Sequence, residues 1–430
     1  MLLRVIGVWT LTLSVINFIV GSAIFVVPAG AAKELGSAGV LAYLVAAALV
    51  LVVALCFAEA GSRVTATGGA YAYVERAFGP WLGFVVASLM WVANGVVAGA
   101  AVANALIGSL ATVVPTLGVG GPRAGLLIAI FLGFGCLNVL GTTLGARSVV
   151  VLTLLKLAPL LILLVAGLSS VEVGNLQWTD PITTGGLARG SLLLVFALTG
   201  MEIALTPTGE VRDPARTVPR AAVLGVVGTA GLYIAIHLVA QGVLGPDLVR
   251  FDGAPLAEVA NRVLGPVGRS LLVVGAAIST IGYISGDILS TPRSLYALSV
   301  NGLLPKSLSY LHATRQTPVV AIVSYCVITL GFALTGSFQQ LALLNAVGVL
   351  LVYLAVVAAL FKLRRDRVVA DRTPLRLVGG PLIPLVALVL IVALLAGATR
   401  AEQLSAAGFI LVTTVFYFSW ITWGKMPAKR

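Results

Sequence analysis

Long apolar segments follow one another along the whole chain, separated by short polar connections. Uncharged segments cover Val5 to Ala32, Leu35 to Ala58, Ala77 to Pro122, Ala124 to Ala146, Ala221 to Pro246, Gln316 to Phe361, Leu377 to Thr399 and Gln403 to Gly424. About 20 apolar residues in a helix cross the roughly 30 Å hydrocarbon core of a bilayer. The pattern therefore predicts an all-α integral membrane protein.

Three further apolar segments contain a charged residue within the span. They are Ser148 to Val171 with Lys156, Gly190 to Gly209 with Glu202, and Ser270 to Val300 with Asp287. Gly336-Ser337 divides the segment from Gln316 to Phe361 into two helices, whereas PTLGVGGP ends one long, tilted helix that begins near Gly79. The sum is twelve predicted transmembrane helices.

The first segment contains NFIVGSAIFVVPAG, in which Gly, Ser and Pro interrupt an apolar helix that needs none of them. Aligning GSAIFVVPAG at Gly21 with GMEIALTPTG at Gly200 gives identical residues at four of ten positions, which include Pro28 with Pro207 and Gly30 with Gly209. These segments are the first and sixth helices, which correspond if a unit of five helices repeats. An odd number of helices inverts the second unit, and paired interruptions of this kind point to a transporter site.

Unwinding at these two places would free backbone N–H and C=O groups that lipid cannot satisfy. Free N–H groups at the start of a half-helix suit a carboxylate, and freed carbonyls suit an ammonium. The two interruptions together therefore predict a cavity for a zwitterion. The alternative is that Gly and Ser only allow the helices to pack closely.

The composition agrees with a membrane protein and argues against several other classes. Hydrophobic residues make up 59% of the chain, charged residues 10%, and the mean hydropathy is +1.09, beyond the range of soluble domains. The three cysteines, Cys56, Cys136 and Cys326, lie in apolar segments, so we predict no disulfide and no metal site. No arrangement of catalytic residues is recognisable, so neither an enzyme nor a cofactor is predicted.

The net charge of +12 follows from the predicted topology. With the amino terminus inside, nineteen of the 27 Lys and Arg residues fall on the cytoplasmic side, seven on the opposite side, and Lys156 within the membrane. Both termini are therefore predicted to be cytoplasmic, in a multi-pass protein of the cell membrane. The positive charge faces an anionic inner leaflet, and a nucleic-acid partner is not needed to explain it.

Three ionisable residues within the spans are candidates for function, because such groups are costly in a membrane. Lys156 lies nine residues beyond Arg147, about 14 Å deep, and Asp287 lies eleven residues before Leu298, about 17 Å deep. If their helices are neighbours, Lys156 and Asp287 form an ion pair, which either couples transport or holds the bundle permanently. Burial and pairing shift protonation in opposite directions, so the sequence leaves both alternatives open.

Glu202 follows the apex of the predicted break in the sixth helix. Its carboxylate binds a cationic substrate, carries a proton, or caps freed N–H groups, and all three interpretations stay open. His237 is a lone histidine in an apolar helix, where a hydrogen bond within the bundle is the usual explanation. Phe196 and Trp91 are candidate walls of the cavity, although aromatic residues in a bundle mostly pack.

Several motifs resemble those of the amino acid-polyamine-organocation (APC) permeases. They are GSAIF in the first helix, GGAYAYVERAFGP after the second, NVLG in the fourth, GMEIALTPTGEVRDPARTVPRA from Gly200 to Ala222, and TPRSLYALSVNGLLP from Thr291 to Pro305. The resemblance implies the leucine-transporter-like fold, an inverted 5+5 repeat with two additional helices. The corresponding units are residues 1–180, 181–365 and 366–430, the last holding helices 11 and 12. It also implies secondary transport of amino acids by alternating access.

The resemblance also implies the roles of particular residues. The family's Gly-Ser-Gly in helix 1, which holds the substrate carboxylate, maps onto Gly21, Ser22 and Ala23, and the carbonyls that hold the amine map onto Phe196, Ala197 and Thr199. Many members have a lysine in helix 5 where sodium-coupled relatives bind a cation, and Lys156 looks like that residue. Asp287 falls where some relatives have serine. The candidate binding residues are Gly21, Ser22, Ala23, Ile24, Phe196, Ala197, Thr199, Gly200, Met201 and Glu202, and the candidate coupling residues are Lys156, Asp287 and Glu202.

Together these observations predict an amino acid permease, proton-coupled or exchanging, for small neutral L-amino acids. Ala23 replaces the family's second glycine, and its methyl group narrows the cavity. The alternatives are transport of cationic amino acids or polyamines, with Glu202 or Asp287 as counter-charge, and a non-transporting amino acid receptor. Some animal relatives join a heavy subunit through a cysteine in an external loop, and because no cysteine lies there, we predict no such partner.

Overall fold

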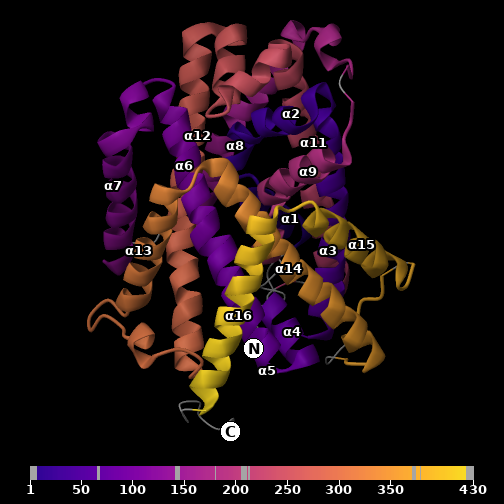
Figure 1. The fold of residues 1–430 in the computed structure, drawn as a ribbon, viewed down its shortest axis with the longest axis vertical. Coiled ribbons are helices and arrows are strands. Elements are labelled where there is room, and N and C mark those ends of the chain that lie inside the picture. Colours follow the sequence, from indigo (N-terminus) through magenta and orange to yellow (C-terminus); the bar gives the residue numbers. More distant parts are fainter. Residues whose placement is uncertain are drawn as a thin grey trace.

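The computed structural model describes residues 7–64, 68–140, 146–179, 181–204, 211, 214–369, 374–377 and 379–422. Within these ranges the chain forms helices and no strand. The helices pack into one bundle, with α7 and α13 at one edge and α15 at the other (Figure 1). The predicted all-helical fold is confirmed at this level.

The helical elements follow the predicted apolar segments. The first part of the chain contains α1 (Val8–Ile19), η1 (Ala23–Phe25), α2 (Val27–Leu35), η2 (Gly36–Gly39), α3 (Val40–Arg63), α4 (Ala70–Phe78), α5 (Pro80–Met90), η3 (Trp91–Val97), α6 (Ala98–Ala111), η4 (Pro115–Gly118), α7 (Gly120–Val139), α8 (Ala146–Gly167), η5 (Leu168–Ser170) and η6 (Val173–Leu176). The second contains α9 (Thr184–Leu198), α10 (Met201–Ala204), α11 (Pro214–Leu244), η8 (Gly245–Phe251), α12 (Pro255–Val300), η9 (Lys306–Ser309), α13 (Val319–Thr335), α14 (Phe338–Arg365), α15 (Leu382–Ala396) and α16 (Arg400–Thr422).

Within the described ranges, seven helical stretches are long and apolar enough to cross a membrane. They are Val27–Arg63, Pro80–Ala111, Gly120–Val139, Arg216–Phe251, Pro255–Val300, Phe338–Arg365 and Arg400–Thr422. Five shorter apolar helices accompany them, namely Val8–Ile19, Leu155–Ser170, Thr184–Leu198, Val319–Thr335 and Leu382–Ala396. The chain is therefore a multi-pass membrane protein.

Both predicted interruptions occur where the sequence placed them. α1 ends at Ile19, three non-helical residues follow, and the chain resumes as η1 and α2. α9 ends at Leu198 and α10 begins at Met201, with Gly200 between them at a φ of 113°. Pro207 and Gly209, the second half of the sequence match, lie outside the described residues.

The helix predicted from Gly79 runs without a gap from Pro80 to Ala111, but its middle, η3, is a π-helix. A π-helical turn shifts the backbone hydrogen bonds and is frequent at functional sites. The predicted division at Gly336-Ser337 is confirmed. There Ser337 begins α14 with a capping box, in which Ser337 Oγ accepts from Gln340 N and Gln340 Oε1 accepts from Ser337 N.

α12 is longer than the predicted helix from Ser270 to Val300, because it begins at Pro255 and bends at Gly265. Gly265 has a φ of 68°, which glycine adopts without the steric cost of a side chain. The ion pair between Glu258 and Arg269, 2.7 Å between Oε2 and Nη2, joins the segments on the two sides of the bend. The first ten residues of α12 thus form a separate helical arm.

α1 begins and α16 ends toward the same side of the bundle (Figure 1). We call the other side, where α2 ends and α12 begins, the distal side. The connections there are packed closely: Asn175 Nδ2 donates to Gly242 O at 2.9 Å, and a Cβ on Gly108 of α6 would lie 2.8 Å from Gly253 O. α8 and α11 therefore both end at the distal side, and α12 runs back from it.

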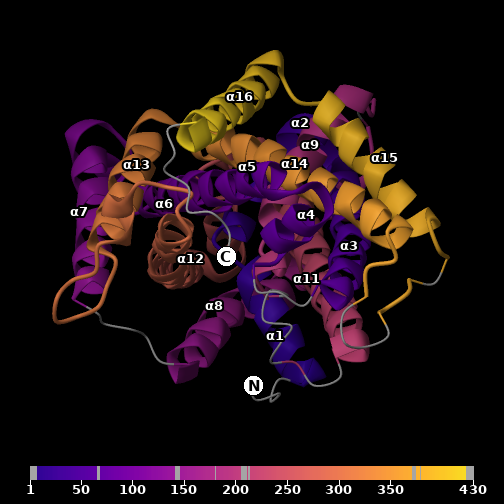
Figure 2. The same cartoon turned by 90° about the horizontal axis from the view of Figure 1, so that it is seen from below.

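An ion cluster joins α3 and α14 on the side opposite the distal side. The Glu59 carboxylate is 1% exposed and accepts hydrogen bonds from Arg63 (2.9 Å to Nη2) and Arg364 (2.5 Å to Nη2). Leu377 N also donates to Glu59, and Arg364 Nη1 donates to Gly380 O. The cluster therefore joins Leu377 and Gly380, which precede α15, to the ends of α3 and α14; these three helices lie beside one another (Figure 2).

Candidate functional site

The two interrupted segments lie against each other inside the bundle. A Cβ on Gly200 would lie 2.6 Å from Phe18 O, closer than a side chain tolerates. The positive φ of Gly200 disfavours any other residue for a second reason. Glycine at this position is therefore what allows the end of α1 to touch the break between α9 and α10.

Side chains from other helices donate hydrogen bonds to carbonyl oxygens at the end of α1. Lys156 Nζ of α8 donates to Asn17 O at 2.7 Å, and the Tyr233 hydroxyl of α11 donates to Ile19 O at 3.1 Å. Two of the carbonyls that unwinding frees are thus satisfied within the protein. Sequence reasoning missed Tyr233, because a tyrosine in an apolar helix resembles any packed aromatic residue.

The other side of this interruption presents hydrogen-bond donors. η1 follows Ser22, and the first N–H groups of a helix have no partner within it. The Ser22 side chain is 1% exposed, and its Oγ has no protein partner among the described residues. Ser22, Ala23 and Ile24 therefore form a compact group of donors beside the break in the other half of the chain.

The end of α9 contributes carbonyls and an aromatic ring. Phe196 O accepts from Thr199, at 2.7 Å from Oγ1 and 3.4 Å from N. The Phe196 ring makes an edge contact with Phe338 of α14, with ring centroids 5.8 Å apart. Phe338 is a further candidate residue that the sequence analysis did not identify, although it directly follows the predicted boundary at Gly336-Ser337.

Glu202 is buried, and its carboxylate is surrounded by donors. It accepts from Gly200 N (3.1 Å to Oε2), Asn94 Nδ2 (2.8 Å to Oε1) and the Tyr353 hydroxyl (3.0 Å to Oε2). Of the three interpretations that the sequence left open, this geometry matches capping of a freed N–H group. The same carboxylate links the break to η3 and to α14.

The π-helical segment η3 is held by side chains from two other helices. Asn345 Nδ2 of α14 donates to Ala93 O at 2.7 Å, and the Tyr283 hydroxyl of α12 donates to Asn94 O at 3.1 Å. These carbonyls belong to the part of the helix where the regular bonding pattern changes. Glu202 therefore belongs to a polar network that connects η3, α12 and α14 beside the two interruptions.

The predicted ion pair between Lys156 and Asp287 is wrong. Asp287 instead accepts hydrogen bonds from the hydroxyls of Thr291 and, at 2.5 Å to Oδ2, Tyr325 of α13. A Cβ on Gly99 of α6 would lie 3.0 Å from Asp287 Oδ2, so a glycine makes room for the carboxylate. Asp287 lies where α6, α12 and α13 meet, whereas Lys156 lies at the interrupted first helix.

The error came from measuring depth along each helix from its own end. α8 and α12 are neighbours and run in opposite directions, and Gly275 of α12 packs against Pro159 of α8, with 2.7 Å from an added Cβ to Cγ. Lys156 lies three residues before Pro159 in α8. Because α12 runs in the opposite direction, the α12 residue at about the same height as Lys156 lies one turn beyond Gly275, at Ser279. Asp287 lies two further turns along, about 12 Å from that level.

The remaining candidates lie at different distances from the interruptions. Trp91 opens η3, and its buried indole Nε1 has no protein partner among the described residues. His237 lies in α11, one turn beyond Tyr233, and packs against Tyr43 of α3. Trp91 thus lies in η3, the segment whose Asn94 donates a hydrogen bond to Glu202. His237 lies outside the group of predicted binding residues.

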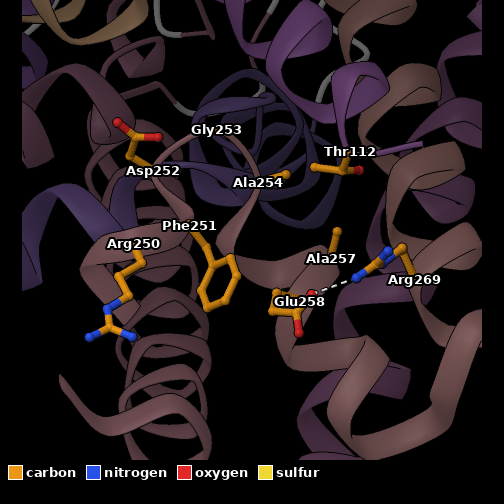
Figure 3. A pocket seen from close by; sticks show the side chains of 9 residues that line it. All are labelled: Thr112, Arg250, Phe251, Asp252, Gly253, Ala254, Ala257, Glu258 and Arg269. Atoms are coloured by element: carbon orange, nitrogen blue, oxygen red, sulfur yellow. Dashed lines mark hydrogen bonds and ion pairs between the residues drawn. The ribbon is translucent and has the colours of Figure 1, made fainter. Parts of the chain in front are cut away.

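Two cavities open on the distal side, and neither is lined by residues 17–25 or 196–202, which form the two interruptions themselves. The larger, about 470 Å³, lies between the end of α2, η2, residues 174–179 and 181–183, and the end of α11 with η8; we call it the distal cleft. The smaller, about 270 Å³, lies beneath residues 250–254, where Glu258 meets Arg269 (Figure 3). The smaller cavity is lined by Glu258 and Arg269, which lie on the two sides of the bend in α12.

Comparison with known proteins gives consistent matches over most of the chain. Residues 6–424 match the sequence pattern of a family described as amino acid permease. The serine/threonine exchanger SteT of Bacillus subtilis is 27% identical over 82% of this chain and 81% of its own length. The rat b(0,+)-type amino acid transporter 1 is 27% identical over 95% and 86%, and the human large neutral amino acids transporter small subunit 2 is 27% identical over 78% and 64%.

Proposed function

The chain belongs to the amino acid permease family, and from this premise we propose that it moves small neutral L-amino acids across the membrane by alternating access. The observation that carries the proposal is the contact between the two interrupted segments, Gly200 against Phe18 O. It brings the donors of one break beside the carbonyls of the other. Such a pair of helix ends suits the two charges of an α-amino acid.

In this proposal the backbone binds the α-carboxylate and the α-ammonium, the two groups that α-amino acids share. The N–H groups that begin η1, with the Ser22 hydroxyl, receive the carboxylate. The carbonyls of Ala197 and Thr199 receive the ammonium, because Phe196 O is already bonded to Thr199 and Asn17 O to Lys156. The Phe196 ring, paired with Phe338, covers this site toward the start of α14.

Three observations support a small neutral side chain. Ala23 adds a methyl group beside the donors and is 5% exposed. Glu202, the counter-charge that a cationic substrate would need, is engaged by Gly200, Asn94 and Tyr353. One relative is named a serine/threonine exchanger, and serine and threonine have small neutral side chains. Cationic amino acids and polyamines therefore have less support.

We assign coupling to Lys156, Asp287 and Glu202, each by a different contact. Lys156 holds the end of α1, so loss of its charge weakens the bond to Asn17 O and releases the interrupted helix. Glu202 ties the second interruption to η3 and α14. Asp287 lies in the neighbouring group of α12 and α13, where it acts through Tyr325.

We further propose the arrangement of twelve spans as two inverted five-helix units, followed by α15 and α16, with both termini cytoplasmic. The seven long and five shorter apolar helices, taken in chain order, support that count. We propose that the protein functions without a disulfide-linked heavy subunit, although one relative is named a small subunit. Cys56, Cys136 and Cys326 all lie within helices, not in distal connections.

The experiment is uptake of a radiolabelled amino acid mixture into proteoliposomes under two conditions. One has an inward proton gradient, and the other has only unlabelled amino acids inside. Uptake driven by the gradient alone indicates proton symport and makes the buried charges the coupling groups. Uptake that requires internal amino acids indicates obligatory exchange, and absence of uptake under both conditions contradicts the proposal.

A further inference from the structure

Three polar side chains occupy successive turns of one face of α11. Tyr233, His237 and Gln241 are spaced by four residues and are 0%, 0% and 3% exposed in an otherwise apolar stretch, LYIAIHLVAQGVL. We call these three residues the α11 column. α11 packs along α3 and α1 through this region (Figure 2).

The two ends of the α11 column reach different parts of the transporter. At one end the Tyr233 hydroxyl donates to Ile19 O, at the interruption of the first helix. At the other end Gln241 lines the distal cleft, where its Nε2 donates to Asn175 O at 3.2 Å and its Oε1 has no protein partner among the described residues. The column therefore runs from a polar cleft to the predicted substrate site.

The middle of the α11 column contains polar atoms that the described residues leave without partners. The rings of His237 and Tyr43 have centroids 4.8 Å apart, and both imidazole nitrogens and the Tyr43 hydroxyl lack a protein partner there. Buried polar groups are almost always hydrogen-bonded, and leaving one unpaired costs free energy. Several of them next to one another, close to a polar cleft, favour hydrogen bonding to water that enters from the cleft.

The connection between His237 and the cleft is short. A Cβ on Gly39 of η2 would lie 2.8 Å from His237 Nε2, so the imidazole edge faces the backbone of η2. Gly36 and Ser37, one turn earlier in the same element, line the distal cleft. One turn of a short helix therefore separates the imidazole from the cleft.

Few ionisable groups surround His237. Tyr43 is the one in ring contact with it, and Tyr233 lies one turn away on the same helix. Other ionisable residues on the elements packed around this part of α11 lie at the cleft or at the first interruption. They are Lys33 and Glu34 of α2, Arg189 of α9, which pairs with Glu34 and Glu402, Glu172, whose backbone N–H donates to Gly242 O, Asp247 and Arg250 of η8, which pair with each other, and Lys156 of α8.

We propose that the α11 column, together with Tyr43, conducts protons between the distal cleft and the interruption of the first helix, with His237 as the group that binds them. One proton from water in the cleft converts the neutral imidazole to imidazolium. On the Tyr233 side that proton passes to water or to the substrate carboxylate at the interruption, which restores the neutral ring, because Ile19 O, to which Tyr233 donates, cannot accept it. The inference rests on the proposed amino acid transport and adds a route by which the pH on the distal side changes the rate of that transport. Histidine suits this task because the neutral imidazole has one accepting and one donating nitrogen, so it can take up a proton at one nitrogen and release one from the other.

The direct test observes the imidazole itself. The chain has two histidines, so His312→Gln leaves His237 as the only one, and His312 lies in an exposed connection outside the site. NMR of histidine-labelled His312→Gln protein in nanodiscs follows the ring between about pH 3.5 and 8.5, because burial disfavours the charged ring. We expect the signal to titrate, and to shift its midpoint in the Tyr43→Phe background. A ring that stays neutral, with N–H protons that do not exchange with solvent, overturns the proposal.

A transport assay separates this proposal from the function on which it rests. Amino acid counterflow at equal pH on both sides tests transport, and the ratio of uptake at about pH 5.5 and 7.5 on the distal side tests the route. We expect His237→Gln to keep counterflow while this ratio falls to about one, and His312→Gln to keep both. A wild-type pH response in His237→Gln overturns the route, whereas loss of counterflow in the wild-type protein overturns the transport function.

Discussion

Replacing Gly200 by alanine tests whether the contact between the two interrupted segments is as close as the structure indicates. The added methyl group would lie 2.6 Å from Phe18 O and 2.9 Å from Phe18 C. Both atoms belong to the backbone, so no change of rotamer relieves the overlap. The residue must also keep a φ of 113°, which only glycine adopts readily.

The expected loss of stability is the sum of two terms. A non-glycine residue held at an unfavourable φ costs about 1–3 kcal/mol. Overpacking against an atom that cannot move away costs a further 1–3 kcal/mol or so. Gly200→Ala is therefore expected to lower the free energy of unfolding by about 2–6 kcal/mol.

Gly21→Ala is the matched control from the other interruption. Its added methyl group has Ile19 O, at 4.0 Å, as its nearest neighbour, and Gly21 has no positive φ, so a change below about 1 kcal/mol is expected. The assay is the fraction of monodisperse protein left after heating each purified variant in the same detergent. Equal melting of Gly200→Ala and the wild-type protein would refute the reasoning, as would a larger loss in Gly21→Ala.

Three other substitutions test separate contacts. Lys156→Ala is expected to fold and to exchange amino acids but to lose uptake driven by a pH gradient, because the bond to Asn17 O that its charge strengthens is gone; unchanged gradient-driven uptake contradicts this role. Arg364→Ala leaves the buried Glu59 carboxylate with one arginine fewer and is expected to cost about 2–4 kcal/mol by thermal unfolding, with part of the loss restored by adding Glu59→Gln. Phe338→Ala is expected to raise the KM for uptake, and a double-mutant cycle with Phe196→Ala should give a coupling of about 0.5–1.5 kcal/mol; additive effects would count against the ring contact.

The positions of the spans could be predicted because the bilayer imposes one length and one polarity on every crossing helix. The interruptions at Gly21 and Gly200 could be predicted for a related reason, since Gly and Pro are conspicuous in such helices. The π-helix η3 could not, because no residue type marks the change from α-helical bonding in an apolar stretch. The bend at Gly265 was missed because the helical arm before it is too polar to resemble a membrane span.

The candidate site was predictable where it depends on the backbone and less so where it depends on side chains from distant helices. The sequence places Ser22 and Phe196 beside the interruptions. It does not show that the Tyr233 hydroxyl donates a hydrogen bond to Ile19 O, or that the Tyr353 hydroxyl donates one to Glu202. The mistaken pairing of Lys156 with Asp287 has the same origin. Depth within one helix is known from the sequence, whereas the relative height of two helices depends on how their surfaces pack.

The measurement that tests the central claim most directly is competition for counterflow of labelled alanine. Unlabelled alanine, ethylamine and propionate would be compared at equal concentrations in proteoliposomes. If the two interruptions bind both the carboxylate and the ammonium, only alanine competes, because each analogue leaves one set of buried groups unpaired. Competition by ethylamine or propionate as strong as that by alanine would contradict the claim that both helix breaks hold the substrate.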